Sequence, residues 1–304
     1  MKSVAVYFDA PAFDDYPFNK PLYAQAYHEF AALLAQKGVT FFIVREQSTY
    51  VGKNVFQGVW IFQDGSFQRR EGKMYVDLIY NKGYFKADDG AHVLNDPKLD
   101  DLCTDKWKTY QLIPNLSPMT VIAHDAEGLD TALHNIPSDL TVVKPLDGEE
   151  GEGVEIAPKA EIRAKDHSYP LLVQEFLDTS AGIPDIVGGT HDFRLTSING
   201  EIIVCFVRTP PPKSLIANVA LGGAKKEIPI AKIPNEALSL FRKVEEKLTA
   251  FPVRIYATDM GRTVNGEWKI IELNSKPGLN PRSKGPNFAR FQDVLADTLI
   301  SALP

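Results

Sequence analysis

Residues 141–154 read TVVKPLDGEEGEGV and carry the strongest fold signal in the chain. A run of β-branched residues predicts a strand that ends at Lys144. Gly148, Gly151 and Gly153 predict a loop whose backbone N–H groups can approach a ligand closely. A lysine followed by such a loop, between two strands, suits a polyphosphate. The other common phosphate-binding patterns, GxxxxGK[ST] and GxGxxG, are absent from the sequence.

Three oxygen-bearing side chains follow in residues 256–279, YATDMGRTVNGEWKIIELNSKPGL. Glu272 and Asn274 are two residues apart on a predicted strand, so both point to one face. Asp259 lies thirteen residues before Glu272, across a predicted turn at about 265–266. An antiparallel pairing through that turn would place Asp259 opposite Glu272. Carboxylate and amide oxygens are the ligands that Mg²⁺ takes, so the spacing predicts a magnesium site.

The N-terminal part of the chain has the pattern of a small α/β domain. Strands are expected at 4–8 and 41–44, with a helix at 22–34 that stops at Gly38, which indicates a parallel, Rossmann-like start. A hairpin is expected from 58–62 through the turn Asp64–Gly65, followed by a strand at 74–80. The acidic stretch 87–105 is interpreted as a linker. Two late helices are expected at 235–250 and 288–302, the second capped by Asn287.

Several segments, taken in order, resemble the motifs of the ATP-grasp superfamily, and most closely those of its glutathione-synthetase and ribosomal-protein glutamate-ligase branch. The matching stretches are DKWKTYQL (105–112), VVKPLDGEEGEGV (142–154), QEFL (174–177), HDFRL (191–195) and IIELNSKPGL (270–279). The resemblance covers roughly 95–279. It implies an α/β fold with an N-terminal Rossmann-like pre-grasp domain at 1–94. An ATP-grasp fold of two α+β lobes would follow, a small lobe at 95–178 and a large lobe with the metal site at 179–304.

The resemblance also implies a role for each matching residue. Those expected to bind ATP are Lys106 and Lys144 at the α- and β-phosphates, the loop residues Gly148, Gly151 and Gly153, Gln174, Glu175, Phe176 and Leu177 at the adenine edge, and Asp178 at the ribose. Two Mg²⁺ ions, for which Mn²⁺ can substitute, would be held by Asp259, Glu272 and Asn274. The implied catalytic residues are Arg208 at the acyl-phosphate, Asn218 beside the γ-phosphate, and Arg194.

Two departures from the family pattern stand out. Several relatives carry a second arginine two residues before the position of Asn218, where this chain has Ile216. The missing charge would then come from elsewhere, for example from Arg194, Lys213 or Arg282. The glycine loop is also unusually acidic, with glutamates at 149, 150 and 152. A solvated loop and the recruitment of a cationic substrate both explain these glutamates.

Composition excludes several classes of protein. The 304 residues are 44% hydrophobic and 24% charged, with a net charge of −6, which argues against a generally basic nucleic-acid surface. Two cysteines are too few for a disulfide framework or a zinc cluster. No secretory signal or membrane-length apolar stretch is visible, so a cytoplasmic protein without a membrane partner is expected.

The function expected from the sequence is an ATP- and Mg²⁺-dependent ligase that joins a carboxylate to an amine through an acyl-phosphate, releasing ADP and phosphate. Amino acids or peptides are the substrates that the resemblance implies, and a homo-oligomer is possible. Two alternatives remain open at this point. One is an ATP-grasp phosphotransferase acting on a small molecule, and the other is a nucleotide-binding protein without catalysis.

Overall fold

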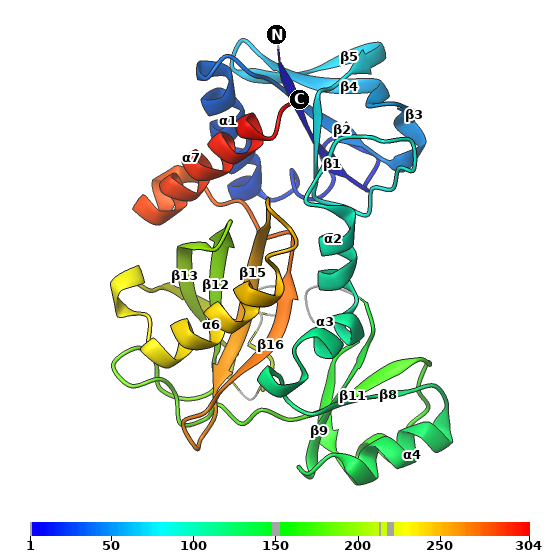
Figure 1. Ribbon diagram of the computed structural model, residues 1–304, viewed down its shortest axis with the longest axis vertical. Coiled ribbons are helices and arrows are strands. Elements are labelled where there is room, and N and C mark those ends of the chain that lie inside the picture. The colour runs from blue at the N-terminus through cyan, green and yellow to red at the C-terminus, as the bar shows by residue number, and fades with distance from the viewer. Residues whose placement is uncertain (1, 148–152, 213, 218–221) are drawn as a thin grey trace. The chain divides into compact units, whose positions relative to one another are not determined.

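The computed structural model describes residues 2–147, 153–212, 214–217 and 222–304. It is a mixed α/β protein that divides into two compact units (Figure 1). Unit 1 contains Met1–Leu99, Val253–Ile255 and Lys276–Pro304, and unit 2 contains Asp100–Pro252 and Tyr256–Ser275. The sequence placed 276–304 in the third domain, whereas the structure groups these residues with the N-terminal ones. The division of the remainder at 178 into two lobes stays a prediction.

Unit 1 is built on a sheet with β1 (Ser3–Phe8) and β2 (Thr40–Arg45) at its centre. The strand order is β3 (Tyr50–Gly52), β4 (Val55–Gln63), β2, β1, β6 (Leu78–Asn81) and β7 (Val93–Leu94), and β5 (Ser66–Tyr75) pairs with β4. The pairs β1–β2, β1–β6 and β6–β7 are parallel, which confirms the expected parallel start. The strands β3, β4 and β5 are antiparallel, so the sheet as a whole is mixed.

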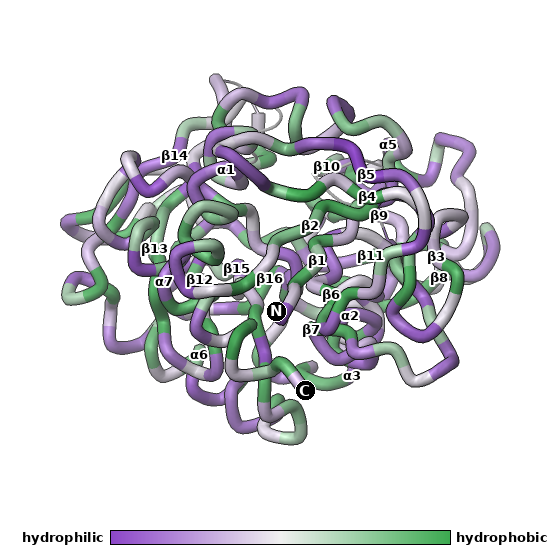
Figure 2. The backbone as a smooth tube through the Cα atoms, turned by 90° about the horizontal axis from the view of Figure 1, so that it is seen from above, coloured by the Kyte–Doolittle hydropathy of each residue, from purple (hydrophilic) through white to green (hydrophobic). Residues whose placement is uncertain are grey.

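The strand expected at 74–80 is wrong, although the turn at Asp64–Gly65 is correct. The turn connects β4 to β5, and residues 76–77 separate β5 from β6. The Asp77 carboxylate accepts hydrogen bonds from the Ser3 backbone N–H and hydroxyl, which holds this break beside β1. The sequence did not predict β5, because its residues QRREGK are polar on both faces of the strand. Figure 2 shows hydrophobic colouring on β4 and hydrophilic colouring on β5.

Two helices of unit 1 pack against each other, although they lie at opposite ends of the chain. They are α1 (Pro21–Gln36), which ends before Gly38 at φ +78°, and α7 (Pro286–Ser301). Lys37 forms an ion pair with Asp297 of α7 at 2.7 Å. The expected cap of α7 at Asn287 is wrong: Gly285 is the N-cap residue, because Pro286 has the backbone geometry of the first helical position.

The stretch 87–105 is not a plain linker, because it contains β7 and the helix α2 (Pro97–Thr104). Asn95 within it is fully buried, and its side chain bonds to both backbone groups of Ile255. Most of the acidic residues here, Asp88, Asp89, Asp96 and Asp101, are exposed, which is why composition alone resembled a linker, but Asp100 of α2 is buried.

In unit 2, a sheet with the order β10–β9–β11–β8 lies beside short helices. Its strands are β8 (Thr120–Ala123), β9 (Leu140–Pro145), β10 (Glu155–Pro158) and β11 (Leu171–Glu175). The helices α4 (Ala126–Asn135) and α5 (Lys159–Arg163) pack on it, whereas α3 (Lys106–Leu112) contacts the other sheet of the unit. β9 and β10 are antiparallel neighbours, as the strand–loop–strand prediction required. Leu129 and Leu133 of α4 pack with Val143 and Val173 in the core.

The other sheet of unit 2 has the order β14–β13–β12–β15–β16. Its strands are β12 (Asp192–Ile198), β13 (Glu201–Thr209), β14 (Ala224–Glu227), β15 (Ile255–Arg262) and β16 (Trp268–Asn274), and α6 (Asn235–Lys247) packs on it (Figure 1). Among the described residues, no helix is both long and apolar enough to cross a lipid bilayer. Short 3₁₀ turns complete the structure: η1 (Gln47–Thr49), η2 (Pro114–Leu116), η3 (Ile230–Lys232) and η4 (Arg282–Lys284).

Candidate functional site

Two lysines meet in unit 2, where α3 begins and β9 ends. Asp105 caps α3 by accepting hydrogen bonds from the N–H groups of Trp107 and Lys108. The Lys106 N–H donates to the carbonyl oxygen of Leu146, at 2.9 Å, which holds the start of the helix against the end of β9. Lys144 is buried at the end of β9. The predicted pair of phosphate-binding lysines is therefore held on two elements that are joined at their ends.

The ammonium of Lys144 lies in a largely dry environment. Burial, opposed by Glu272 and reinforced by Lys106, lowers the pKa of Lys144 to about 8. The electrostatic influence of both residues shows that they lie close to Lys144. The lysines predicted to bind phosphate and one carboxylate predicted to bind metal are thus brought together.

Gln174 of β11 holds this ammonium in place. The Lys144 Nζ donates to Gln174 Oε1 at 2.8 Å, and Gln174 Nε2 donates to Thr120 Oγ1 at 2.8 Å. Thr120 Oγ1 in turn donates to the Pro118 carbonyl at 3.0 Å. The sequence had assigned Gln174 to the adenine edge and missed this side-chain contact. The only hint in the sequence is a polar residue on an apolar strand, because the pairing of the neighbouring Leu172 with Lys144 appears only in the structure.

The residues after Gln174 form a hinge that leaves the sheet. The Glu175 N–H donates to the Met119 carbonyl at 2.8 Å, and the Phe176 N–H to Ser138 Oγ at 3.3 Å. Leu177 lies directly over Gly261 of β15, where a Cβ atom would come within 2.9 Å of Leu177 Cδ2. Only glycine at 261 lets the hinge approach β15 this closely.

Asp178 at the end of the hinge is exposed. Its Oδ1 accepts the N–H of Ser180 at 2.9 Å, and its backbone carbonyl accepts the N–H of Val264. The predicted ribose contact would therefore use Oδ2, the oxygen of Asp178 that does not form this turn bond.

A cluster of buried charges crosses the second sheet. Asp259 of β15 accepts hydrogen bonds from Arg194 of β12 on both carboxylate oxygens, and from Arg208 Nη2 of β13 at 2.7 Å. Arg208 also forms an ion pair with Asp192 of β12, the residue directly opposite it. Both predicted catalytic arginines therefore contact a predicted metal ligand.

The two carboxylates of this cluster titrate in opposite directions. Burial acts to raise the pKa of Asp259, but Arg194 and then Arg208 outweigh it and hold that pKa below its usual value. Burial and the neighbouring Asp259 raise the pKa of Asp192, and the arginines only partly offset this rise. Asp259 thus stays ionised, as a metal ligand must.

The predicted metal ligands have the register that the turn spacing required. Asp259 pairs with Glu272 of β16, and Asn274 pairs with Ala257, so that the three lie on adjacent strands. Two carboxylates and one amide oxygen form a hard donor set that suits Mg²⁺, with phosphate oxygens and water completing an octahedral shell. In the described part of the chain, no cluster of three or more His, Cys, Asp or Glu side chains is placed to hold a metal.

Other predicted residues fall in different places. Gly148, Gly151 and Asn218 lie outside the described residues, as do Lys213 and the three glutamates of the acidic loop. Gly153 is described, and two features require glycine there. Its φ is +70°, and a Cβ atom at this position would lie 3.1 Å from the ring of Pro145.

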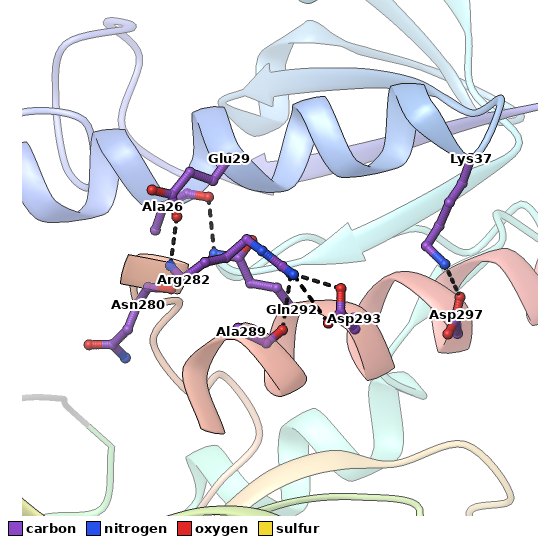
Figure 3. A network of polar contacts seen from close by, with 9 residues as sticks. All are labelled: Ala26, Glu29, Lys37, Asn280, Arg282, Ala289, Gln292, Asp293 and Asp297. Atoms are coloured by element: carbon purple, nitrogen blue, oxygen red, sulfur yellow. Dashed lines mark hydrogen bonds and ion pairs between the residues drawn. The ribbon is translucent and has the colours of Figure 1, made fainter. Parts of the chain in front are cut away.

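Arg282, considered as a replacement for the missing arginine, belongs to unit 1 and has a structural task there. It binds both carboxylate oxygens of Asp293 and the carbonyl of Ala289, and its N–H donates to Glu29 of α1 (Figure 3). These contacts join η4 to α1 and α7. The guanidinium of Arg282 thus makes structural contacts within unit 1.

A family model described as "Prokaryotic glutathione synthetase, ATP-grasp domain" matches residues 105–251. Over these residues the chain is similar to ATP-grasp proteins. A probable alpha-L-glutamate ligase from Legionella pneumophila (strain Corby) is 26% identical over 207 residues, which cover 65% of this chain and 64% of that protein. The match thus spans a little less than two thirds of the relative's length.

Solved structures share the fold over nearly the whole chain. The D-alanyl-alanine synthetase A of Vibrio cholerae O1 biovar eltor superposes with a TM-score of 0.66 at 11% identity, covering 99% of this chain and 98% of that one. A RimK domain protein ATP-grasp from Sphaerobacter thermophilus gives 0.63 at 15% identity, covering 98% and 99%. The expected α/β fold of the ATP-grasp ligases is confirmed.

The ATP-grasp match divides the site unevenly. The stretch 105–251 includes Lys106, Lys144, the hinge and both arginines, whereas Asp259, Glu272 and Asn274 follow its end. The prediction of a metal site is therefore supported by geometry alone. Asp259 pairs with Glu272, and Asp259 contacts the two arginines inside the matched stretch.

Proposed function

We propose that this protein is an ATP- and Mg²⁺-dependent ligase that joins a carboxylate to the amine of an amino acid or peptide. One observation carries the proposal: Lys106 and Lys144 gather beside Glu272, while its strand partner Asp259 is bound by Arg194 and Arg208. Unit 2 thus contains cations that can bind phosphates, oxygen ligands that can bind a metal, and arginines that can stabilise a developing negative charge. The match to probable alpha-L-glutamate ligases supports an amino-acid substrate.

Each residue has a part in transferring the γ-phosphoryl group of ATP to a carboxylate. Lys106 and Lys144 bind the α- and β-phosphates, and Gln174 keeps the Lys144 ammonium aimed. The hinge at Glu175 and Leu177 receives the adenine with its backbone groups. Arg208 and Arg194 stabilise the charge that develops as the acyl-phosphate forms and the amine attacks it. Phosphoryl transfer requires alignment and charge neutralisation more than covalent catalysis by the protein.

Asp259, Glu272 and Asn274 would hold magnesium beside the phosphates. Bound Mg²⁺ neutralises phosphate charge and polarises the transferring group. Asp259 already accepts three hydrogen bonds from arginine, and a carboxylate has about four lone-pair positions. A metal at Asp259 would therefore share the carboxylate with Arg194 and Arg208, which couples metal binding to the position of both guanidinium groups.

The test is a product search by mass spectrometry. The protein is incubated with ATP, Mg²⁺ and pooled amino acids and peptides, with glutamate offered as one amine, and new masses are compared with a Glu272→Gln control. A carboxylate labelled with ¹⁸O should transfer one labelled oxygen to the released phosphate, which is the signature of an acyl-phosphate. A stable phosphorylated product without any amide would show a phosphotransferase, and binding without turnover would show a non-catalytic nucleotide binder.

A further inference from the structure

A third basic residue, Lys225 of β14, lies next to the two arginines of the site. In the β13–β14 ladder Lys225 is directly opposite Arg208, and in the β12–β13 ladder Arg208 is directly opposite Asp192. Residues directly opposite each other on antiparallel strands point to the same face of the sheet. Lys225, Arg208 and Asp192 therefore form one row, and Arg208 joins this row to Asp259 at 2.7 Å.

The side chain of Lys225 leans from β14 over β13. Its Nζ lies 4.2 Å from the ring centroid of Phe206, and Arg194 lies near the same ring at 5.9 Å. Phe206 is opposite Arg194 in the β12–β13 ladder. The aromatic face thus holds the ammonium on the side of the sheet that carries Arg194 and Arg208.

Lys225 lies close to two other cations. Three cations, Lys225, Arg194 and Arg208, lie on this face of the sheet with three carboxylates, Asp192, Asp259 and Glu227. Although Lys225 is exposed as a whole residue, burial of its ammonium and then repulsion by Arg194 and Arg208 lower its pKa to about 8, and the attraction of Glu227 only partly opposes this shift. An anion bound between these cations would relieve their mutual repulsion.

We propose that Lys225 binds the γ-phosphoryl oxygens of ATP, and so supplies a positive charge that Ile216 does not provide. The proposal rests on the proposed function, because it takes the triphosphate to run from Lys106 and Lys144, past Glu272 and Asp259, toward the arginines. Lys225 lies beyond Arg208 in that direction. It therefore meets the terminal phosphoryl group and leaves the α- and β-phosphates to the two lysines of α3 and β9.

The neighbouring residue provides a matched control. Lys226 is next on the same strand, so its side chain points to the opposite face, where its Nζ donates to the carbonyl of Ile186 at 3.2 Å. Lys225→Met and Lys226→Met each remove one positive charge from β14. The two variants lose this charge from opposite faces of the sheet, and Lys226→Met also loses the bond to Ile186.

The experiment measures nucleotide binding by calorimetry with Mg²⁺ and two probes, AMP-PNP, which has a γ-phosphoryl group, and ADP, which lacks one. Lys225→Met should weaken AMP-PNP binding by about tenfold or more, as expected for a hydrogen bond to a charged group, and change ADP binding less than twofold. Lys226→Met should change neither, and Lys225→Arg should retain most of the AMP-PNP affinity. Melting temperatures confirm that the variants fold, and Lys225→Gln replaces the methionine variant if it does not.

Two results would overturn the inference. Unchanged AMP-PNP binding in Lys225→Met would show that the ammonium does not meet the γ-phosphoryl group and would leave the carboxylate substrate as its partner. An equal loss for AMP-PNP and ADP would show a general effect on the nucleotide site. The inference can fail separately from the ligase proposal: a wild-type protein that binds both nucleotides but forms no amide refutes the ligase, and the comparison of the two probes still tests Lys225.

Discussion

The hydrogen bond from Lys144 to Gln174 predicts how the pH dependence of ATP binding should change when it is removed. Gln174→Met keeps the size of the side chain but removes the acceptor of the buried ammonium, at 2.8 Å, and the donor to Thr120. A hydrogen bond to a charged group contributes about 1.5–3 kcal/mol. At about 1.4 kcal/mol per pKa unit, its loss should lower the pKa of Lys144 by roughly one to two units from its value of about 8.

ATP affinity should fall as the pH rises, because the charged form of Lys144 is the one that binds phosphate. In the wild type the ammonium is retained below pH 8 and ATP affinity should decline as the pH rises through about 8. In Gln174→Met the decline should begin one to two pH units lower, so that affinity is already reduced at pH 7. Calorimetric titration with Mg²⁺ and ATP between pH 6 and 9 measures both midpoints. Thr120→Val, which removes only the far bond, should shift the midpoint less. Identical midpoints in Gln174→Met and the wild type would refute the reasoning.

The remaining predictions concern the metal, the arginines and the fold. Glu272→Gln should nearly abolish Mg²⁺-dependent ADP release while the melting temperature stays close to that of the wild type; normal turnover would rule out the metal assignment. Arg208→Ala should lower kcat by about 10²–10³, since one preorganised donor contributes about 3–4 kcal/mol, with ATP affinity changed only a few-fold. Because Arg208 is a buried partner of Asp259, Arg208→Ala should also cost about 3–5 kcal/mol of stability, and Arg208→Lys, which keeps the charge, should retain more of both kcat and stability. A wild-type kcat in folded Arg208→Ala would exclude a catalytic role. His191 accepts the N–H of Arg262 on Nε2, and burial lowers its pKa, so unfolding free energies from urea titrations should fall as the pH drops below about 6.5, by at most about 1.4 kcal/mol per unit, and His191→Gln should flatten this dependence.

Local patterns in the sequence predicted much of the site. The spacing from Asp259 to Glu272 across one turn was sufficient to predict their register, because a hairpin of known turn position leaves few alternatives. The strand that ends at Lys144 was likewise predictable from its run of β-branched residues. These features depend on residues that are close together in the chain.

What the sequence could not show depends on contacts between distant strands. Gln174 binds Lys144 because β9 and β11 are neighbours in a particular register, and Arg208 lies between Asp192 and Asp259 because β12, β13 and β15 are ordered as they are. Neither arrangement leaves a trace in local periodicity. The sequence therefore identified the arginines as candidates, but it could not show that both are bound to a predicted metal ligand.

The composition of unit 1 has a consequence for how the chain is synthesised. The helix α7, whose buried side chains include Phe288 and Leu295, packs on α1 but is encoded after the whole of unit 2. At about 5–20 residues per second, the 176 residues from 100 to 275 take roughly 9–35 s to emerge from the ribosome. During that interval the apolar side of α1 is not yet covered by α7. Unit 2, in contrast, is complete once residue 275 has been synthesised, and only the short segment Val253–Ile255 within that range belongs to unit 1. Nascent chains stalled before residue 276 should therefore expose α1 to chaperones and proteases, even where unit 2 has already folded.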